Sequence, residues 1–220
     1  MNQNYYDELG IRQIKGFAPA LIFVDVIRAY TDPHSPLFLR NACQTLDRIM
    51  SVAKFLNNKG HPIIYTRPNC TSAESTSRCE GSEKVLVFGE KRADSGWNHY
   101  ADDALIPRHS ASLRGAHSSQ ELIKSYASAF AMTNLAFTLK KKGCNAVFIA
   151  GFTTGGSIRS TATDAISQGF RTFVLTEAVA DRSQEISKIH LNEIRNMGAE
   201  VISLEQAYHI YSSTFQTLQR

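Results

Sequence analysis

The sequence predicts one α/β domain, spanning 1–220, in which a doubly wound, mainly parallel sheet lies between two layers of helices. Three observations predict this Rossmann-like, three-layer sandwich. Short apolar runs recur along the chain, segments with apolar residues at helical spacing separate them, and a glycine follows most of these segments. Such alternation implies right-handed crossovers between parallel strands. A length of 220 residues fits one generous domain.

The N-terminal elements follow this alternation. Pro19–Asp25 is an apolar run that ends in a carboxylate, which is typical of a strand buried on both faces. Leu39–Lys59 has apolar residues at helical spacing, and Gly60 provides a C-cap. Pro62–Thr66 is the second strand. Arg67–Ser119 has Ser/Thr-rich patches and no long period, so we interpret it as an excursion with a short helix or hairpin that covers one end of the sheet.

The C-terminal elements alternate more regularly, and glycines end three of the helical segments, at Gly143, Gly169 and Gly198. In chain order we expect a strand at Glu121–Lys124, a helix from Ser128 or Thr133 to Lys142, a strand at Asn145–Ala150, a helix at Gly155–Gln168, a strand at Arg171–Leu175, a helix at Gln184–Met197, a strand at Glu200–Ile202 and a helix at Leu204–Leu218.

Composition argues against several classes of protein. Lys and Arg number 24 against 20 Asp and Glu, and this net charge of +4 is scattered, so no nucleic-acid partner is expected. Apolar runs stay far below the roughly 20 residues of a membrane span, and the polar N-terminus does not resemble a signal peptide. The four cysteines have no C-x-x-C spacing, which favours free thiols and a cytoplasmic location.

Three polar features fall at the predicted carboxyl edge of the sheet, where such folds bind ligands. Asp25 ends the first strand, Lys124 ends the third, and the loop Gly151–Ser157 follows the fourth. Each has an ordinary structural interpretation, as a turn cap, a solvated strand end or a tight turn with an N-cap. Their coincidence at one edge makes a functional site the better hypothesis.

These segments resemble the isochorismatase-like cysteine hydrolases, and among them enzymes of the N-carbamoylsarcosine amidohydrolase type. The resemblance runs from about Gly16 to Ala207. Its motifs are the opening strand with the loop after it, a lysine motif, a nucleophile loop and an Asp-Arg element, here Ala20–Asp25 with Ala29–Pro33, Lys124–Phe130, Gly151–Ala162 and Ala178–Arg182.

The resemblance implies a catalytic triad. Asp25 takes the position of the general base, Lys124 lies beside it and stabilises the charged forms, and Ser157 stands where the family has its nucleophilic cysteine. The backbone N–H groups of Thr153 and Ser157 form the oxyanion hole, and the Phe152–Thr153 peptide is expected to be cis.

The same resemblance suggests how substrate is held. Arg182 matches an arginine that binds a substrate carboxylate, a task suited to a guanidinium fork. Aromatic side chains are candidates for an apolar wall, although a place in the core is the favoured interpretation for any one of them. They are Tyr30, Phe38, Trp97, Tyr126 and Phe152.

Ser157 departs from the family pattern at the attacking atom. A hydroxyl must lose its proton as it attacks, and a carboxylate with an ordinary pKa of about 4 is a weak base for that step. None of the four cysteines lies where it can replace this residue. Three accounts stay open: a substitution introduced to trap substrate, a natural Ser-Lys-Asp set with Lys124 as base, or a natural site without covalent chemistry.

No metal and no cofactor are expected. The histidines lack a metal-ligand spacing, although His99, His109 and His117 all lie in the excursion, and the motif of the metal-binding nicotinamidase branch is missing. Phosphate-binding glycine motifs are missing too. The resemblance also implies a homo-oligomer, a tetramer or a dimer.

The expected function is hydrolysis of a C–N bond in a small amide or carbamoyl compound, with release of ammonia. Candidate substrates resemble N-carbamoyl amino acids such as N-carbamoylsarcosine, maleamate or biuret. The alternatives are isochorismatase-type hydrolysis of a vinyl ether without a covalent nucleophile, and a catalytically silent binding protein on the same scaffold.

Overall fold

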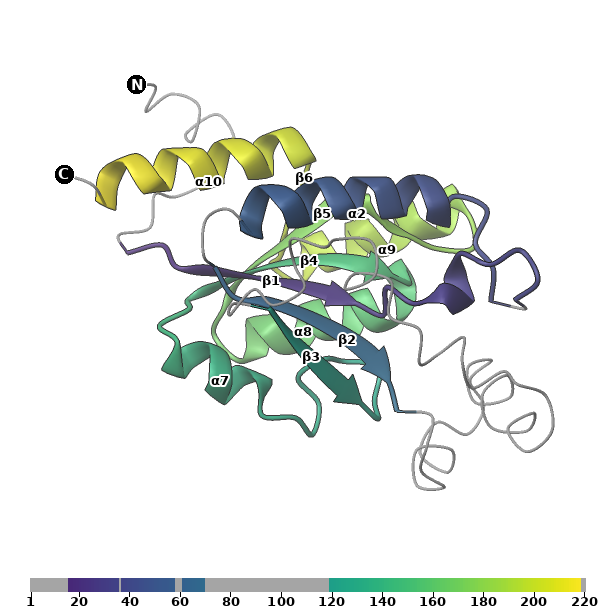
Figure 1. The fold of residues 1–220 in the computed structure, drawn as a ribbon, viewed down its shortest axis with the longest axis horizontal. Coiled ribbons are helices and arrows are strands. Elements are labelled where there is room, and N and C mark those ends of the chain that lie inside the picture. Colours follow the sequence, from purple (N-terminus) through teal and green to yellow (C-terminus); the bar gives the residue numbers. More distant parts are fainter. Residues whose placement is uncertain (1–15, 36, 58–60, 70–118, 219–220) are drawn as a thin grey trace.

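A six-stranded parallel sheet forms the centre of the molecule in the computed structural model, which describes residues 16–35, 37–57, 61–69 and 119–218 (Figure 1). The strand order is β3-β2-β1-β4-β5-β6, which confirms the predicted doubly wound sheet. The strands are β1 (Pro19–Val24), β2 (Ile63–Pro68), β3 (Ser119–Lys124), β4 (Ala146–Phe152), β5 (Arg171–Ala180) and β6 (Glu200–Ile202).

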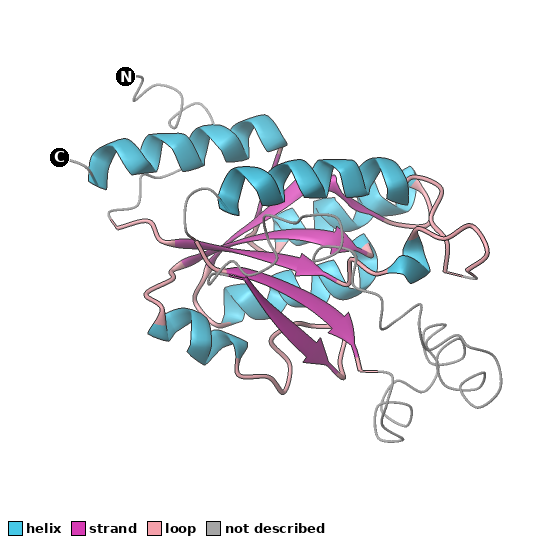
Figure 2. Ribbon diagram, viewed as in Figure 1, coloured by secondary structure: helices cyan, strands magenta, loops and turns pink. Residues whose placement is uncertain are grey.

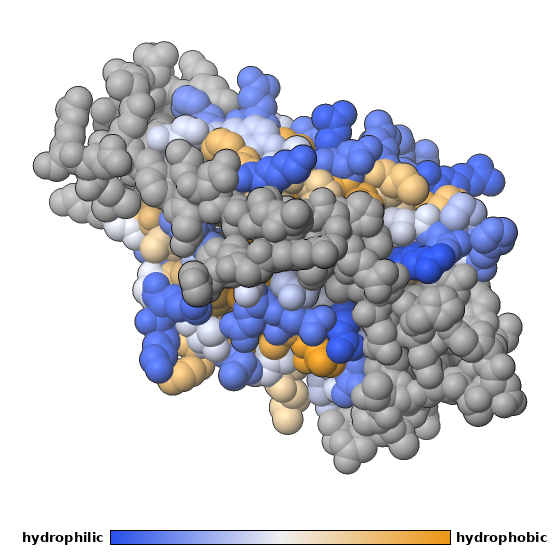
Figure 3. All heavy atoms as spheres, in the orientation of Figure 1, coloured by the Kyte–Doolittle hydropathy of each residue, from blue (hydrophilic) through white to orange (hydrophobic). Residues whose placement is uncertain are grey.

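Helices cover both faces of this sheet (Figure 2). The helices α2 (Ala42–Asn57) and α10 (Leu204–Leu218) lie on one face, and α7 (Leu135–Lys141), α8 (Arg159–Ser167) and α9 (Gln184–Asn196) lie on the other. Right-handed crossovers explain this division. The connection from β1 to β2 crosses the sheet in one direction and the connections from β4 to β6 cross it in the other, so their helices lie on opposite faces. Hydrophilic side chains predominate on the outer side of α2 (Figure 3). No helix in the described ranges is both long and apolar enough to cross a membrane.

The strand β1 is buried along its whole length, and its side chains alternate between two hydrophobic cores. Leu21 and Phe23 pack on the side of α2 and α10, whereas Ala20, Ile22 and Val24 pack on the side of α7, α8 and α9. Because β1 pairs with both β2 and β4, the chain changes direction across the sheet at the β1–β4 boundary. Ligand sites of open α/β sheets lie beyond the carboxyl ends of strands at such a boundary.

Three predicted helix starts differ from the observed ones, and the first of these helices, α2, begins at Ala42 rather than Leu39. The segment before α7 forms bends because side chains at the expected starts bond to nearby backbone: the Ser128 hydroxyl accepts from Phe130 N–H, and the Thr133 hydroxyl donates to the Ala129 carbonyl at 2.7 Å. The helix expected at Gly155 begins instead with a π-helical turn, Thr154–Ile158, that leads into α8.

The strand β5 is also longer than predicted and ends at Ala180 rather than Leu175. Its pairing with β4 shifts register between Ile149 and Gly151, and this irregularity interrupts the apolar run from which its length was predicted. The excursion expected at Arg67–Ser119 lies mostly outside the described residues, as do Trp97, His99, His109 and His117. Of that segment, Arg67 and Pro68 continue β2, and Ser119 opens β3.

Candidate active site

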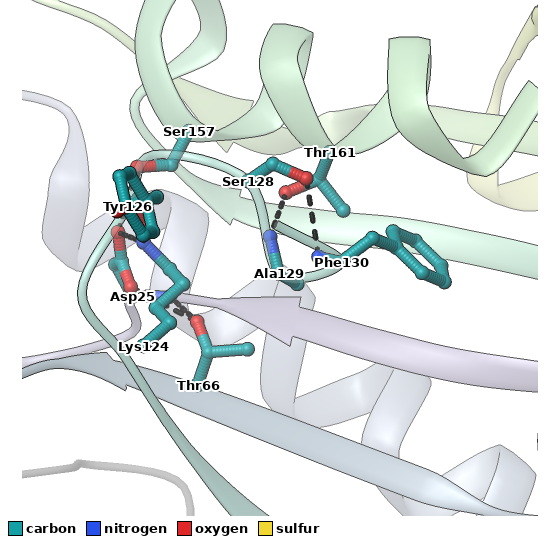
Figure 4. A network of polar contacts seen from close by, with 9 residues as sticks. All are labelled: Asp25, Thr66, Lys124, Tyr126, Ser128, Ala129, Phe130, Ser157 and Thr161. Atoms are coloured by element: carbon teal, nitrogen blue, oxygen red, sulfur yellow. Dashed lines mark hydrogen bonds and ion pairs between the residues drawn. The ribbon is translucent and has the colours of Figure 1, made fainter. Parts of the chain in front are cut away.

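Asp25, Lys124 and Ser157 meet beyond the carboxyl ends of β1, β3 and β4 (Figure 4). The Ser157 hydroxyl donates to Asp25 Oδ2 at 2.8 Å, and Lys124 Nζ donates to the same oxygen at 2.9 Å. A longer contact of 3.5 Å joins Lys124 Nζ to Ser157 Oγ. All three side chains are almost inaccessible, at 1%, 3% and 0% exposure respectively. The sequence prediction therefore named three residues, 132 positions apart at the extremes, that the fold brings into mutual contact.

Lys124 reaches Asp25 across an intervening strand. It ends the edge strand β3, and β2 separates β3 from β1. Strands lie about 4.8 Å apart, so the ammonium must span roughly twice that distance, and a four-carbon stem suits this geometry. Lys124 Nζ also donates to the Tyr126 carbonyl at 3.1 Å. Three acceptors thus surround the three N–H bonds of one buried ammonium.

Thr66, in the C-terminal half of β2, fixes the Asp25 carboxylate. Its hydroxyl accepts from the Asp25 backbone N–H at 3.0 Å and donates to Asp25 Oδ1 at 2.9 Å. Asp25 itself has a φ of 50°, in the left-handed region that L-residues seldom adopt. The sequence analysis missed Thr66 as a site residue. A hydroxyl in the C-terminal half of the strand next to β1 is the signal that points to it.

Ser157 lies on the π-helical turn that follows β4. The strand leaves the sheet through Gly151, where a Cβ would lie 2.1 Å from the Val24 carbonyl oxygen, so no other residue fits between β4 and β1. The Phe152–Thr153 peptide is cis, as expected. Of the predicted oxyanion-hole residues, Thr153 is the N-cap of this turn and Ser157 is the fourth of its five residues.

Three further polar residues that the sequence analysis did not assign hold this region together. Asp181 Oδ2 accepts from the Gly155 N–H at 2.7 Å, and the Ser187 hydroxyl is 2.8 Å from that of Thr154. The Thr161 hydroxyl of α8 accepts from Ala129 N–H at 3.0 Å (Figure 4), which ties the loop after Lys124 to the helix after Ser157.

The predicted substrate-binding residues differ in how deeply their side chains are buried. Tyr30 and Phe152 are buried and pack against each other, with ring centroids 5.4 Å apart, as part of a hydrophobic core. Tyr126 is half-buried beside the triad (Figure 4), and its carbonyl binds Lys124. The side chain of Arg182 is exposed, two residues beyond the end of β5 at the same sheet edge.

The described thiols lie away from this site. Cys43 is exposed on α2, and Cys144 is buried just before β4, at the opposite end of that strand from Ser157. Burial raises the pKa of the Cys144 thiol, which keeps it protonated and unreactive. Among the described residues, no three His, Cys, Asp or Glu side chains are grouped so as to hold a metal ion.

A buried hydroxyl that shares hydrogen bonds with a carboxylate and an ammonium suits attack on an electrophilic carbon. The carboxylate is placed to accept the hydroxyl proton, and the ammonium balances its charge. The site lies at the β1–β4 boundary, where such sheets bind small molecules.

Comparison with known proteins gives a consistent set of relatives. The family model described as the isochorismatase domain matches residues 19–206. Maleamate amidohydrolase of Pseudomonas putida is 28% identical over 209 residues, which cover 93% of this chain and 92% of that protein. N-carbamoylsarcosine amidase of an Arthrobacter species is 27% identical over 208 residues, covering 91% and 74% respectively. An isochorismatase family protein from Desulfovibrio vulgaris superposes with a TM-score of 0.71 at 22% identity, covering 93% of this chain and all of the other.

Proposed function

This chain belongs to the isochorismatase family, and on that premise we propose that it hydrolyses the C–N bond of a small amide or carbamoyl compound and releases ammonia. The observation that carries the proposal is the 2.8 Å hydrogen bond from the Ser157 hydroxyl to Asp25 Oδ2 inside a buried ion pair. Two relatives that align over nine-tenths of the chain are named as amidases of this kind, for maleamate and N-carbamoylsarcosine.

In the first half of the reaction, Ser157 Oγ attacks the amide carbon while Asp25 takes the hydroxyl proton. The tetrahedral adduct places its oxyanion against the backbone N–H groups of Thr153 and Ser157. Asp25 then returns the proton to the leaving nitrogen, the C–N bond breaks, and ammonia departs from an acyl ester on Ser157.

In the second half, Asp25 accepts a proton from water, and the resulting hydroxide attacks the ester carbon. As the C–Oγ bond breaks, Asp25 returns that proton to Ser157 Oγ, and the carboxylic or carbamic acid leaves. Lys124 Nζ stays 2.9 Å from Asp25 Oδ2 and stabilises the ionised carboxylate. The distances favour Asp25 over Lys124 as the base, because Lys124 Nζ lies 3.5 Å from the serine oxygen.

Arg182 gives the proposal its substrate class. Maleamate and N-carbamoylsarcosine each carry a carboxylate besides the bond to be cleaved. Arg182 is a cation at the carboxyl edge of the sheet, two residues beyond β5, and a guanidinium binds a carboxylate through two parallel hydrogen bonds. We therefore place small acids with an amide or carbamoyl group first among the substrates.

The test is ammonia release from a panel of maleamate, N-carbamoylsarcosine, nicotinamide and biuret. The chain as it stands and its Ser157→Cys variant are assayed side by side, with Asp25→Asn as the blank. Asp47→Asn is the matched control, because Asp47 is exposed on α2 and its substitution removes the same charge far from the site.

Turnover by the unaltered chain supports serine as the nucleophile, and a mass increase on Ser157 during turnover identifies the acyl ester. Turnover by Ser157→Cys alone supports an amidohydrolase pocket in which Ser157 blocks the reaction. Absence of ammonia from every substrate with both proteins contradicts the proposal, and vinyl-ether hydrolysis or binding without chemistry then becomes the better hypothesis.

A further inference from the structure

We propose that Asp181 is a positioning residue whose buried carboxylate fixes the turn carrying Ser157 and the backbone of Arg182 in one geometry. This inference rests on the proposed function for its catalytic meaning. Asp181 is 4% exposed. Its Oδ2 accepts from the Gly155 N–H at 2.7 Å, and its Oδ1 accepts from the Arg182 N–H at 2.8 Å.

The position of Asp181 follows from the sheet. The strands β4 and β5 pair in parallel up to Phe152 and Ala180, which are direct partners. Asp181 directly follows Ala180, and the turn Thr154–Ile158 begins two residues after Phe152. One carboxylate therefore ties together the ends of two neighbouring strands, each of which leads to a proposed site residue.

The turn needs such an external anchor. It contains Gly155 and Gly156 in succession, and glycine leaves the backbone many alternative conformations. Hydrogen bonds to an ionised acceptor are roughly twice as strong as neutral ones, so a carboxylate restrains Gly155 better than a carbonyl would.

The other side of the turn is closed by packing. A Cβ on Gly155 would lie 2.2 Å from the imidazole of His190, and the Thr154 hydroxyl bonds to that of Ser187. Both of these neighbours come from α9. The turn is thus held between α9 and Asp181, and its orientation sets where the Ser157 hydroxyl lies relative to Asp25.

The first test measures amide hydrogen exchange by mass spectrometry over peptides that cover 154–158. Asp181→Ala removes both acceptor oxygens. Asp181→Asn keeps the side-chain volume and retains only one acceptor oxygen. We expect Gly155 N–H exchange to accelerate by about tenfold or more in Asp181→Ala and less in Asp181→Asn, because opening of the turn exposes the amide. Asp47→Asn is the control and should leave exchange unchanged. Unaltered exchange in Asp181→Ala would overturn the proposal.

The second test separates positioning from substrate binding. We expect kcat to fall by about 100-fold in Asp181→Ala and by about tenfold in Asp181→Asn, since small misplacement of a reacting group costs rates of this order. The loss should be equal for amides with and without a carboxylate, and KM should change little. A rise in KM for carboxylate substrates without a fall in kcat would contradict a role in the turn, because Asp181 would then act only by positioning Arg182.

The two tests also separate this inference from the proposed function. If the unaltered chain and Ser157→Cys both release no ammonia, the proposed function fails, and hydrogen exchange still decides whether Asp181 fixes the turn. If Asp181→Ala does not fold, the isosteric Asp181→Asn carries both comparisons.

Discussion

Lys124 places its ammonium 2.9 Å from the Asp25 carboxylate from two strands away, and both groups are buried. Removing two such charges from water costs several kcal/mol per ion, which their attraction offsets only with close geometry and further hydrogen bonds. The structure supplies these bonds from Thr66, Ser157 and the Tyr126 carbonyl. This pair is therefore costly to maintain, which favours a chemical role over a purely structural one.

Lys124→Met should destabilise the protein by about 3–5 kcal/mol, because it leaves the Asp25 carboxylate buried without its counter-charge. The double variant Asp25→Asn/Lys124→Met should recover more than half of that loss. Urea unfolding of the wild type, both single variants and the double variant measures the coupling. Losses that simply add in the double variant would contradict a tightly coupled pair.

Thr66→Val should reduce kcat by about tenfold, because the carboxylate of Asp25 loses the hydroxyl that orients it. Stability should fall by about 1–3 kcal/mol, the usual cost of depriving buried polar groups of a hydrogen bond. Thr172→Val is the matched control, since Thr172 is also buried and its hydroxyl bonds to the Phe170 carbonyl at the far end of β5. If both variants lose the same activity, Thr66 has no specific role in orienting Asp25.

The parallel sheet and the meeting of Asp25, Lys124 and Ser157 could be predicted because they depend on local patterns. Buried strands show as apolar runs, and the carboxyl ends of parallel strands share one edge. Local pattern alone does not place the lysine in the site, because a lysine at a strand end is usually solvated. Only the strand order shows that Lys124 points across β2 into the site.

The supporting residues could not be predicted in the same way. Thr66 and Ser187 acquire their roles from contacts with residues 41 and 33 positions away, and no local spacing encodes such contacts. Asp181 belongs to the Asp-Arg element that the resemblance identified, but that motif does not show its contact with Gly155, 26 positions away. The π-helical turn was missed for a related reason. Gly155 and Gly156 favour several backbone paths, and neighbouring elements select one.

Stability should fall as pH rises above about 9, because two buried groups resist ionisation. Burial raises the pKa of Cys144 above its usual 9.0, and burial, with the nearby Cys144, raises that of Tyr211 above 10.0. Both groups hold their protons in the folded protein at pH values where the unfolded chain releases them. Their contribution is therefore complete below the unfolded pKa values and is lost as pH rises toward the folded ones.

Urea unfolding between pH 8 and pH 11 measures this decline. The double variant Cys144→Ala/Tyr211→Phe should have a flatter profile. Cys43→Ala/Tyr208→Phe is the control, because Cys43 is exposed and Tyr208 is half-buried, and its profile should match the wild type. Equal slopes in all three proteins would show that neither buried group governs the alkaline decline.

Gly155→Ala should destabilise the protein by about 1–3 kcal/mol, the usual cost of an added methyl group in a packed site. The new Cβ would lie 2.2 Å from the His190 ring, which is itself held by a 3.0 Å contact with Glu193. His190→Ala removes the obstructing ring, so Gly155→Ala/His190→Ala should regain most of the lost stability. Gly156→Ala is the matched control, because its Cβ would meet the Thr153 hydroxyl at 2.8 Å instead. Thermal unfolding should show that His190→Ala restores stability to Gly155→Ala and not to Gly156→Ala. Equal rescue of both variants would mean that His190 does not define the space above Gly155.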